Sequence, residues 1–161
     1  MSQPHPRIGV AAVVSNANGQ ILVGKRMGSH GSGTWQLPGG HLEYQEEVLV
    51  CAERETLEET ALRVKAHGIM AVTNDIFENE GKHYITLFVH CEMLDPKQQP
   101  QVMEPHKCES WLWRTWGDLK AMNDAAVLGD AGDQLFLPII NLLKQTSDPG
   151  RLVPRGILGT A

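Results

Sequence analysis

The chain lacks three features that would each place it in a particular class of protein. It has only three cysteines and no CxxC pair, which argues against a disulfide framework or a zinc ribbon. It has no excess of basic residues, and its formal net charge of -5 argues against binding to duplex nucleic acid. It has no apolar stretch of membrane-spanning length, and the first ten residues contain no apolar signal-peptide core. We therefore expect a cytoplasmic protein with no membrane partner.

The length and composition fit one globular domain. The chain has 161 residues, of which 42% are apolar and 20% are charged, and it contains no internal repeat. We predict a single domain over residues 1–146 and a loose tail, rich in glycine and proline, over 147–161. The stretch LVPRG in this tail also matches a protease site common in expression vectors, so part of the tail is expected to come from a vector.

Runs of β-branched residues bounded by turn residues predict most of a sheet. The first two runs are joined by NANG, which has the turn chemistry of a hairpin, and a second hairpin is expected around EGK. Trp111 and Trp113 share one face of the last predicted strand and are expected to be core residues. The predicted strands cover residues 7–15, 20–26, 35–40, 68–79, 83–94 and 109–115.

The remaining segments are predicted to be loops and helices. Residues 27–34 are rich in glycine and serine, which indicates either a mobile loop able to close over a substrate or a plain surface turn. A short helix followed by a loop is expected over 117–132. Residues 133–144 have helical spacing, with Pro138 expected to break the helix or displace its start.

The helix predicted after LPGG has a face that changes from apolar to acidic. Glu46 and Glu47 are expected in its first turn, where negative charge suits the helix dipole. Further along, Glu55 and Glu59 are four residues apart and nearly superimposed on the helix surface, so their charges repel. Either one carboxyl keeps a proton or divalent cations bind between them. The whole face runs through Val48, Cys51, Ala52, Glu55, Glu58, Glu59 and Leu62.

This acidic face has two interpretations. Oxygen ligands alone favour Mg²⁺ or Mn²⁺ over zinc, and Mg²⁺ is usually held by a few carboxylates together with waters and substrate phosphates. That reading points to phosphate chemistry. The other reading is a solvated, salt-bridged face in which Arg54 pairs with Glu58, four residues further on. The spacing alone leaves both open.

The same helix carries a second apolar stripe on its opposite side, formed by Val50, Leu57 and Ala61. A helix that is apolar on two sides is expected to pack between two layers. The acidic end of the first stripe would then lie near a sheet.

Residues 40–62 resemble the Nudix box, the signature of the Nudix hydrolases: Gly-x5-Glu-x7-Arg-Glu-U-x-Glu-Glu-x-Gly-U, where U is a bulky aliphatic residue. Two positions depart from it, because Thr56 stands at the first U and Ala61 at the last glycine. The many fixed positions at set spacing favour the metal-binding interpretation. The matching positions are Gly40, Glu46, Arg54, Glu55, Glu58, Glu59 and Leu62.

The resemblance implies a fold, a reaction and a cofactor. The fold is an α/β/α sandwich, of the α/β class, with a mixed β-sheet. The reaction is hydrolysis of a nucleoside diphosphate linked to another group. The cofactor is Mg²⁺, with Mn²⁺ as a substitute.

The resemblance also implies roles for individual residues. One glutamate would deprotonate the attacking water, directly or through a metal-bound water. Arg54 and Glu46 would orient the acidic cluster. The expected catalytic residues are Glu55, Glu58, Glu59 and Arg54. The expected metal ligands are Glu55, Glu59, Glu58, Gly39 and Glu104.

The similarity continues beyond this signature. The stretches LPGGHLE, HYITLFV, MEPHKCESWLW and DQLF resemble a MutT-like branch of plant and animal nucleoside-triphosphate diphosphatases that act on guanine nucleotides, oxidised ones included. In that branch a further acid reaches the metal, and Glu104 and Glu109 both qualify here. Two departures leave the base preference open: Leu137 stands where relatives often have tryptophan, and the stretch 123–132 looks longer.

A nucleotide would need contacts to its phosphates and its base. Lys25 and Arg26 end a strand expected to run toward the site, and are either phosphate contacts or a solvated strand end. Trp35 and Phe136 either stack on a base or belong to the core. The expected substrate-binding residues are Lys25, Arg26, Gly40, Trp35, Phe136 and Leu137.

The predicted activity is Mg²⁺-dependent hydrolysis of a nucleoside triphosphate, preferably a purine one with oxidised guanine included, to nucleoside monophosphate and pyrophosphate. Other substrates within the family are ADP-ribose, coenzyme A, capped RNA, dihydroneopterin triphosphate and isoprenyl diphosphates. A non-catalytic nucleotide sensor is the alternative of a different class. Relatives of this kind are often homodimers, so a homodimer is a further expectation.

Overall fold

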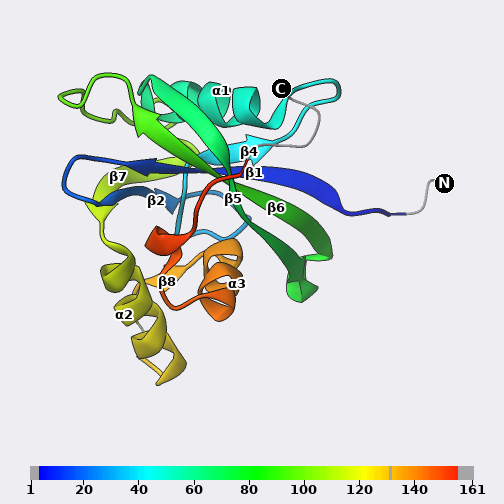
Figure 1. Cartoon of the computed structure of the whole chain (residues 1–161). Coiled ribbons are helices and arrows are strands. Elements are labelled where there is room, and N and C mark those ends of the chain that lie inside the picture. Colours follow the sequence, from blue (N-terminus) through cyan, green and yellow to red (C-terminus); the bar gives the residue numbers. More distant parts are fainter. Residues whose placement is uncertain (1–3, 131, 156–161) are drawn as a thin grey trace.

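The computed structural model describes residues 4–130 and 132–155 and shows a curled mixed sheet between helices (Figure 1). Helix α1 (Val48–Thr60) lies on one face of the sheet, and α2 (Trp116–Val127) and α3 (Leu137–Gln145) lie on the other. The predicted α/β/α sandwich with a mixed sheet is therefore confirmed. No helix within the described ranges is both long and apolar enough to cross a membrane.

The sheet joins strands that are far apart in the sequence. The central strand β1 pairs in parallel with β6 and antiparallel with β2 and β4, while β5 and β6 form the second predicted hairpin. The order along the sheet is β5-β6-β1-β2-β3-β8, with β7 paired to β2. The strands are β1 (Arg7–Ser15), β2 (Ile21–Arg26), β3 (Thr34–Gln36), β4 (Gly39–His41), β5 (Val64–Phe77), β6 (Lys82–Met93), β7 (Cys108–Arg114) and β8 (Gln134–Leu135).

Both faces of the sheet are covered by apolar side chains, which form two core clusters. On the α1 side, Cys51 and Ala52 of the helix pack against the sheet together with Trp111, and Trp113 packs against this cluster, as predicted for the two tryptophans. On the other side, Trp35 and Phe88 pack with residues of α2 and α3. The candidate active site lies at β4.

Local sequence explains where the helices begin. In α2, Thr115 and Asp118 form a capping box, in which each side chain accepts a hydrogen bond from the other residue's backbone N–H. In α3, Pro138 occupies the first turn, where its missing N–H has no helical partner to lose, so the helix starts at Leu137. Strand β8 takes Gln134 and Leu135, so the helix starts later than the helical spacing from residue 133, as expected from Pro138.

Two predictions for α1 are wrong. The helix begins at Val48, so Glu46 and Glu47 precede its first turn, where Gln45 has a positive φ of 65° that turns the chain into the helix. The second apolar stripe does not pack against another layer. Val50 and Leu57 are 49% and 40% exposed, because the sheet covers only one side of α1 and the other helices lie beyond the sheet.

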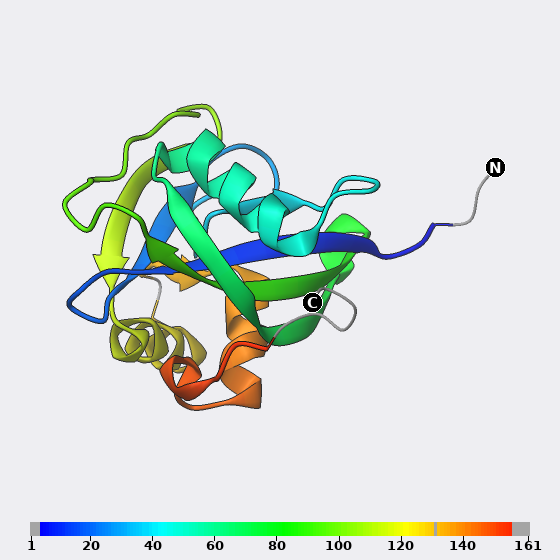
Figure 2. The ribbon, with the colours of Figure 1, turned by 45° about the horizontal axis from the view of Figure 1, so that its top comes forward.

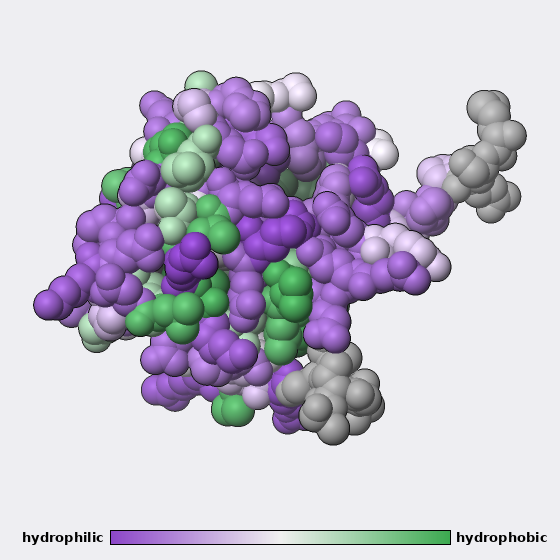
Figure 3. All heavy atoms as spheres, turned by 90° about the horizontal axis from the view of Figure 1, so that it is seen from above, coloured by the Kyte–Doolittle hydropathy of each residue, from purple (hydrophilic) through white to green (hydrophobic). Residues whose placement is uncertain are grey.

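The surface over α1 is mostly hydrophilic, with several separate hydrophobic patches (Figure 3). Within the segment predicted to be a loose tail, residues 149–151 form a short turn beside α2, and the chain then runs to β5, where Arg155 pairs with Ile69 (Figure 2). Pro149 is buried, and the backbones of Ile69 and Arg155 exchange two hydrogen bonds of 2.9 Å. Residues 156–161 of that prediction lie outside the described residues.

Ala61 ends α1 in a conformation that glycine usually adopts. Its φ of 63° is left-handed, and its N–H donates to Leu57 O at 2.9 Å, so the helix closes although the side chain is unfavourable there. Ala61, which stands at the last glycine of the signature, therefore leaves the shape of the helix end unchanged, and its left-handed conformation makes this end less stable than glycine would.

We predict that Ala61→Gly stabilises the protein by about 1 kcal/mol, because glycine removes the steric cost of the left-handed conformation. Chemical denaturation measures the change. Ala121→Gly is the matched control, since Ala121 is an exposed residue inside α2, and there glycine should destabilise by about 1 kcal/mol. Destabilisation by both substitutions would contradict the prediction.

Candidate active site

The glycines of LPGG allow α1 to approach the sheet closely. Strand β4 lies against β1, and a side chain at Gly39 would overlap the carbonyl oxygen of Val10. A side chain at Gly40 would overlap the carboxylate of Glu55. Glycine is therefore required at position 39, where the overlap is with backbone, and at position 40 a side chain would displace the carboxylate of Glu55.

Glu59 is the most deeply buried acid of the cluster. Its side chain accepts a hydrogen bond of 3.0 Å from the N–H of Gly39, and the residue is only 7% exposed. Its backbone oxygen accepts from the indole of Trp111 at 3.3 Å, which fixes this turn of α1 against β7. Burial, assisted by the nearby charges of Glu55 and Glu104, raises the pKa of Glu59 from an ordinary value of 4.5 to about 8.

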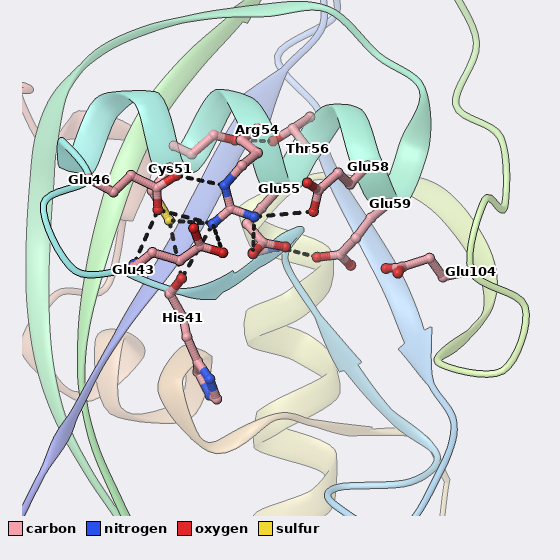
Figure 4. Close-up of polar contacts among 12 residues, drawn as sticks. His41, Glu43, Glu46, Cys51, Arg54, Glu55, Thr56, Glu58, Glu59 and Glu104 are labelled. Atoms are coloured by element: carbon pink, nitrogen blue, oxygen red, sulfur yellow. Dashed lines mark hydrogen bonds and ion pairs between the residues drawn. The ribbon is translucent and has the colours of Figure 1, made fainter.

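Glu55 lies one turn earlier, over Gly40. Burial raises the pKa of Glu55, while the adjacent Arg54 guanidinium opposes that rise. Glu104 also raises this pKa, and its side chain points toward Glu59 from the loop before β7 (Figure 4). Glu109 lies elsewhere: it is exposed and pairs with Lys25 at 3.8 Å. The structure thus brings Glu104, rather than Glu109, to the acids of α1.

Arg54 connects the acids through its guanidinium (Figure 4). It binds Glu46 through two bonds of 2.6 and 3.0 Å, and its Nη1 donates to Glu55 at 2.9 Å and to Glu58 at 3.2 Å. The bond from Arg54 lowers the pKa of Glu46 to about 2, and Glu46 in turn raises the pKa of Arg54. The guanidinium therefore fixes the side chain of Glu55 from one side and makes no ion pair with Glu59.

The acids fit a divalent cation that keeps part of its own hydration. Among residues 4–130 and 132–155, no three His, Cys, Asp or Glu side chains are arranged to hold one metal ion between them. Mg²⁺ commonly binds through one or two carboxylates, with waters and substrate phosphates as its other ligands. Burial and the charges of neighbouring glutamates, Glu104 among them, raise the pKa values of Glu55 and Glu59, so a divalent cation would stabilise their ionised forms.

A pocket of about 140 Å³ adjoins this cluster, and Gly39 and Gly40 line it as well. Most of its other lining is aromatic or apolar. His30 contacts Phe77 and Phe136 with ring centroids 4.7 and 5.3 Å apart. The aromatic lining residues are His30, His41, Phe77, Tyr84, Phe88 and Phe136.

Arg26 supplies the positive charge of this pocket. Its guanidinium carbon lies 4.1 Å from the ring centre of Phe136, its Nε donates to His30 O at 2.9 Å, and it also binds Gln36. Burial lowers the pKa of Arg26. No ion pair with Arg26 occurs among the described side chains, so its charge is available to an anionic ligand.

The structure brings some of the expected substrate contacts together and separates others. Arg26, Gly40 and Phe136 line the pocket. Lys25 does not, because successive strand residues point to opposite faces, and it pairs instead with Asp133 at 3.7 Å. Trp35 is a core residue. Leu137 opens α3 without lining the pocket, which is instead lined by the two residues after it.

Sequence reasoning missed several lining residues. Tyr84 and Thr86 alternate along β6 and share a face with Phe88, so the spacing in HYITLFV carried a usable signal. His30 carried none, because it comes from the loop 27–33 and reaches the pocket by pairing with Glu80, fifty residues away.

Comparison with known proteins agrees with this geometry. The NUDIX domain profile matches residues 5–132, and the chain therefore belongs to the Nudix family. A MutT-like protein of Streptomyces ambofaciens is 33% identical over 91 residues, covering 56% of this chain and 54% of that protein. An RNA pyrophosphohydrolase of Bartonella bacilliformis is 43% identical over 63 residues, covering 35% and 37%.

The fold is shared with solved structures. A crystal structure of a MutT NUDIX hydrolase from Burkholderia pseudomallei superposes with a TM-score of 0.71 at 24% identity, covering 89% of this chain and 99% of the other. The chain spans about half or less of the length of the curated relatives named above, so the match does not establish that it shares their activities. These relatives are bacterial, and they do not support the expected plant and animal branch.

We predict that Glu59 contributes to the stability of the metal-free protein and that this contribution is lost as the pH rises from about 4.5 to about 8. The folded protein holds the proton of Glu59 more tightly than the unfolded chain, so unfolding is hardest below the unfolded pKa and becomes easier as this proton is lost. Denaturant unfolding in the presence of a chelator, at a series of pH values, measures the free energy of unfolding. Glu59→Gln should remove the decrease with pH that Glu59 causes, whereas the control Glu58→Gln, which changes an exposed acid on the same helix, should not.

Proposed function

We propose that the protein is a Mg²⁺-dependent hydrolase of nucleoside triphosphates that yields nucleoside monophosphate and pyrophosphate, with Mn²⁺ able to substitute. One observation carries the proposal: the acids of α1 and the aromatic pocket meet at the same two glycines, Gly39 and Gly40. A ligand with a planar base in the pocket would extend its phosphates toward Glu55 and Glu59. Membership of the Nudix family supports the broader proposal that the protein hydrolyses a diphosphate linkage.

Glu55 and Glu59 would hold the metal, assisted by Glu58, Glu104 and Gly39. A bound Mg²⁺ supplies neutralisation of the phosphate oxygens and increases the acidity of water.

The protein's own groups would do the rest of the work. Without a metal Glu59 keeps its proton at neutral pH, since its pKa is about 8, and a bound cation would favour its ionised, metal-binding form. One glutamate of the cluster, directly or through a metal-bound water, would accept the proton of the attacking water. Arg54 keeps Glu55 in place by a hydrogen bond of 2.9 Å, and Glu46 keeps Arg54 in place by two more. Arg26 lies in the pocket with its charge unpaired among the described residues and would bind a phosphate oxygen.

A purine base, oxidised guanine included, is the substrate that we infer from the aromatic lining. Stacking on aromatic side chains is worth about 1–3 kcal/mol per base. The name of the Bartonella relative motivates a second candidate, the 5′-triphosphate end of RNA, since the phosphate chemistry is the same. A nucleotide sensor without activity is less favoured, because Glu55, Glu58 and Glu59 are all present in the chain.

The decisive experiment is a substrate panel assayed for pyrophosphate and monophosphate release with and without Mg²⁺. The panel contains purine and pyrimidine triphosphates, oxidised dGTP, ADP-ribose, coenzyme A, dihydroneopterin triphosphate, an isoprenyl diphosphate, capped RNA and 5′-triphosphate RNA. Preferred turnover of a free purine triphosphate supports the proposal. Turnover confined to RNA ends favours the second candidate, and nucleotide binding without any turnover favours the sensor.

We predict that Glu55→Gln and Glu59→Gln each lower kcat for the best substrate by about 100-fold or more, because each removes charge that would hold the metal or accept the proton. Steady-state kinetics across a Mg²⁺ titration measure the loss. Glu47→Gln is the matched control: it neutralises an exposed glutamate at the N-cap of the same helix, where the side chain caps nothing. Undiminished activity in either site variant would refute the assignment.

A further inference from the structure

A buried carboxylate lies beneath the pocket and takes no part in the chemistry proposed above. Asp75 of β5 is completely buried. Its Oδ2 accepts hydrogen bonds from the hydroxyls of Thr73 at 2.9 Å and Thr86 at 2.5 Å, and its Oδ1 accepts from the amide of Asn141 at 2.9 Å. No ion pair with Asp75 occurs among the described side chains.

These bonds determine how the hydroxyl of Thr86 is oriented. A buried carboxylate is costly unless its oxygens are hydrogen-bonded, and an ionised carboxylate only accepts. A hydroxyl has one hydrogen to donate and two lone pairs. Since Thr86 gives its hydrogen to Asp75, it has only lone pairs to offer to anything else.

The pocket is where those lone pairs are exposed to a ligand. Thr86 lines the pocket, whereas Thr73, which binds the same carboxylate oxygen, does not. The adjacent strand carries Gly9, and a side chain there would sit 3.5 Å from the Thr86 hydroxyl. Gly9 therefore keeps the space beside the hydroxyl free of a side chain, and because Thr86 is only 5% exposed, a ligand reaches it from within the pocket.

We propose that Thr86, oriented by Asp75, selects purine bases that present an N–H donor, as guanine does at N1 and at its exocyclic amino group. Gln36, also in the lining, accepts from Arg26 through its Oε1, and its amide N–H donors suit the acceptors O6 and N7 of guanine. Asp75 is a positioning residue and Thr86 is the specificity determinant. This inference rests on the proposed function only in placing the base in the pocket.

The test compares binding of two nucleoside monophosphates, which the proposed reaction does not consume. Guanosine monophosphate carries N–H donors, and purine riboside monophosphate has the same ring system without one. Isothermal titration calorimetry with the full chain should show tighter binding of guanosine monophosphate. Thr86→Val should weaken that binding by about 3- to 10-fold, the worth of one neutral hydrogen bond, and leave purine riboside monophosphate unaffected.

Two further variants separate recognition from structure. Thr73→Val removes the other hydroxyl from the same oxygen of Asp75 and should leave both affinities unchanged. Thr86→Ser keeps the hydroxyl and should retain the preference for guanosine monophosphate, which keeps the test available if Thr86→Val does not fold. Equal binding of the two ligands to the unaltered protein, or equal effects of the two valine variants, would overturn the inference.

The outcome is independent of catalysis. If the substrate panel shows no turnover of triphosphates while the preference for guanosine monophosphate and its loss in Thr86→Val persist, the proposed function fails and the inference stands. If triphosphates are cleaved but the two monophosphates bind equally, the inference fails and the proposed function stands.

Discussion

The site depends on how closely one helix approaches the backbone of a neighbouring strand. Glu55 lies against β4 because Gly40 has no side chain, β4 lies against β1 because Gly39 has none, and the N–H of Gly39 meets Glu59 directly. This contact buries two acids of like charge side by side, which raises the pKa of both. The same glycines also form part of the pocket wall, so the acidic cluster and the pocket form one continuous surface.

Arg54 distributes its charge unevenly over that cluster. It binds Glu46 most closely and touches Glu55 and Glu58, but it does not reach Glu59. Glu55 therefore has the Arg54 guanidinium beside its carboxylate and Glu59 does not, although the two acids are one helical turn apart. An arrangement of this kind separates the roles of chemically identical side chains by their surroundings rather than by their type.

Much of this fold was accessible from local patterns. The hairpins followed from alternation and turn residues, and the spacing of Glu55 and Glu59 placed both on one face of a helix that the structure contains. Other features depended on the tertiary arrangement. The stripe of Val50 and Leu57 is apolar yet exposed, since only the folded protein shows which side of α1 meets the sheet.

Contacts between distant residues were out of reach for the same reason. Asp75 and Asn141 are 66 positions apart, and neither has a neighbour in sequence that marks it as one half of a buried pair. Lys25 and Arg26 are adjacent, yet strand alternation sends one to surface acids and the other into the pocket. Neither their charge nor their position in the sequence shows which of the two side chains faces the pocket, because this depends on the orientation of the strand in the sheet.

The parallel pairing of β1 with β6 has a consequence for biosynthesis. Residues 7–15 find their partners at 84–92, so the middle of the sheet lacks one side until more than half of the chain has left the ribosome. During that interval the helix with its acidic turn has no completed sheet beneath it. The candidate site therefore forms only when β6 has joined β1 and β4 in the sheet beneath α1.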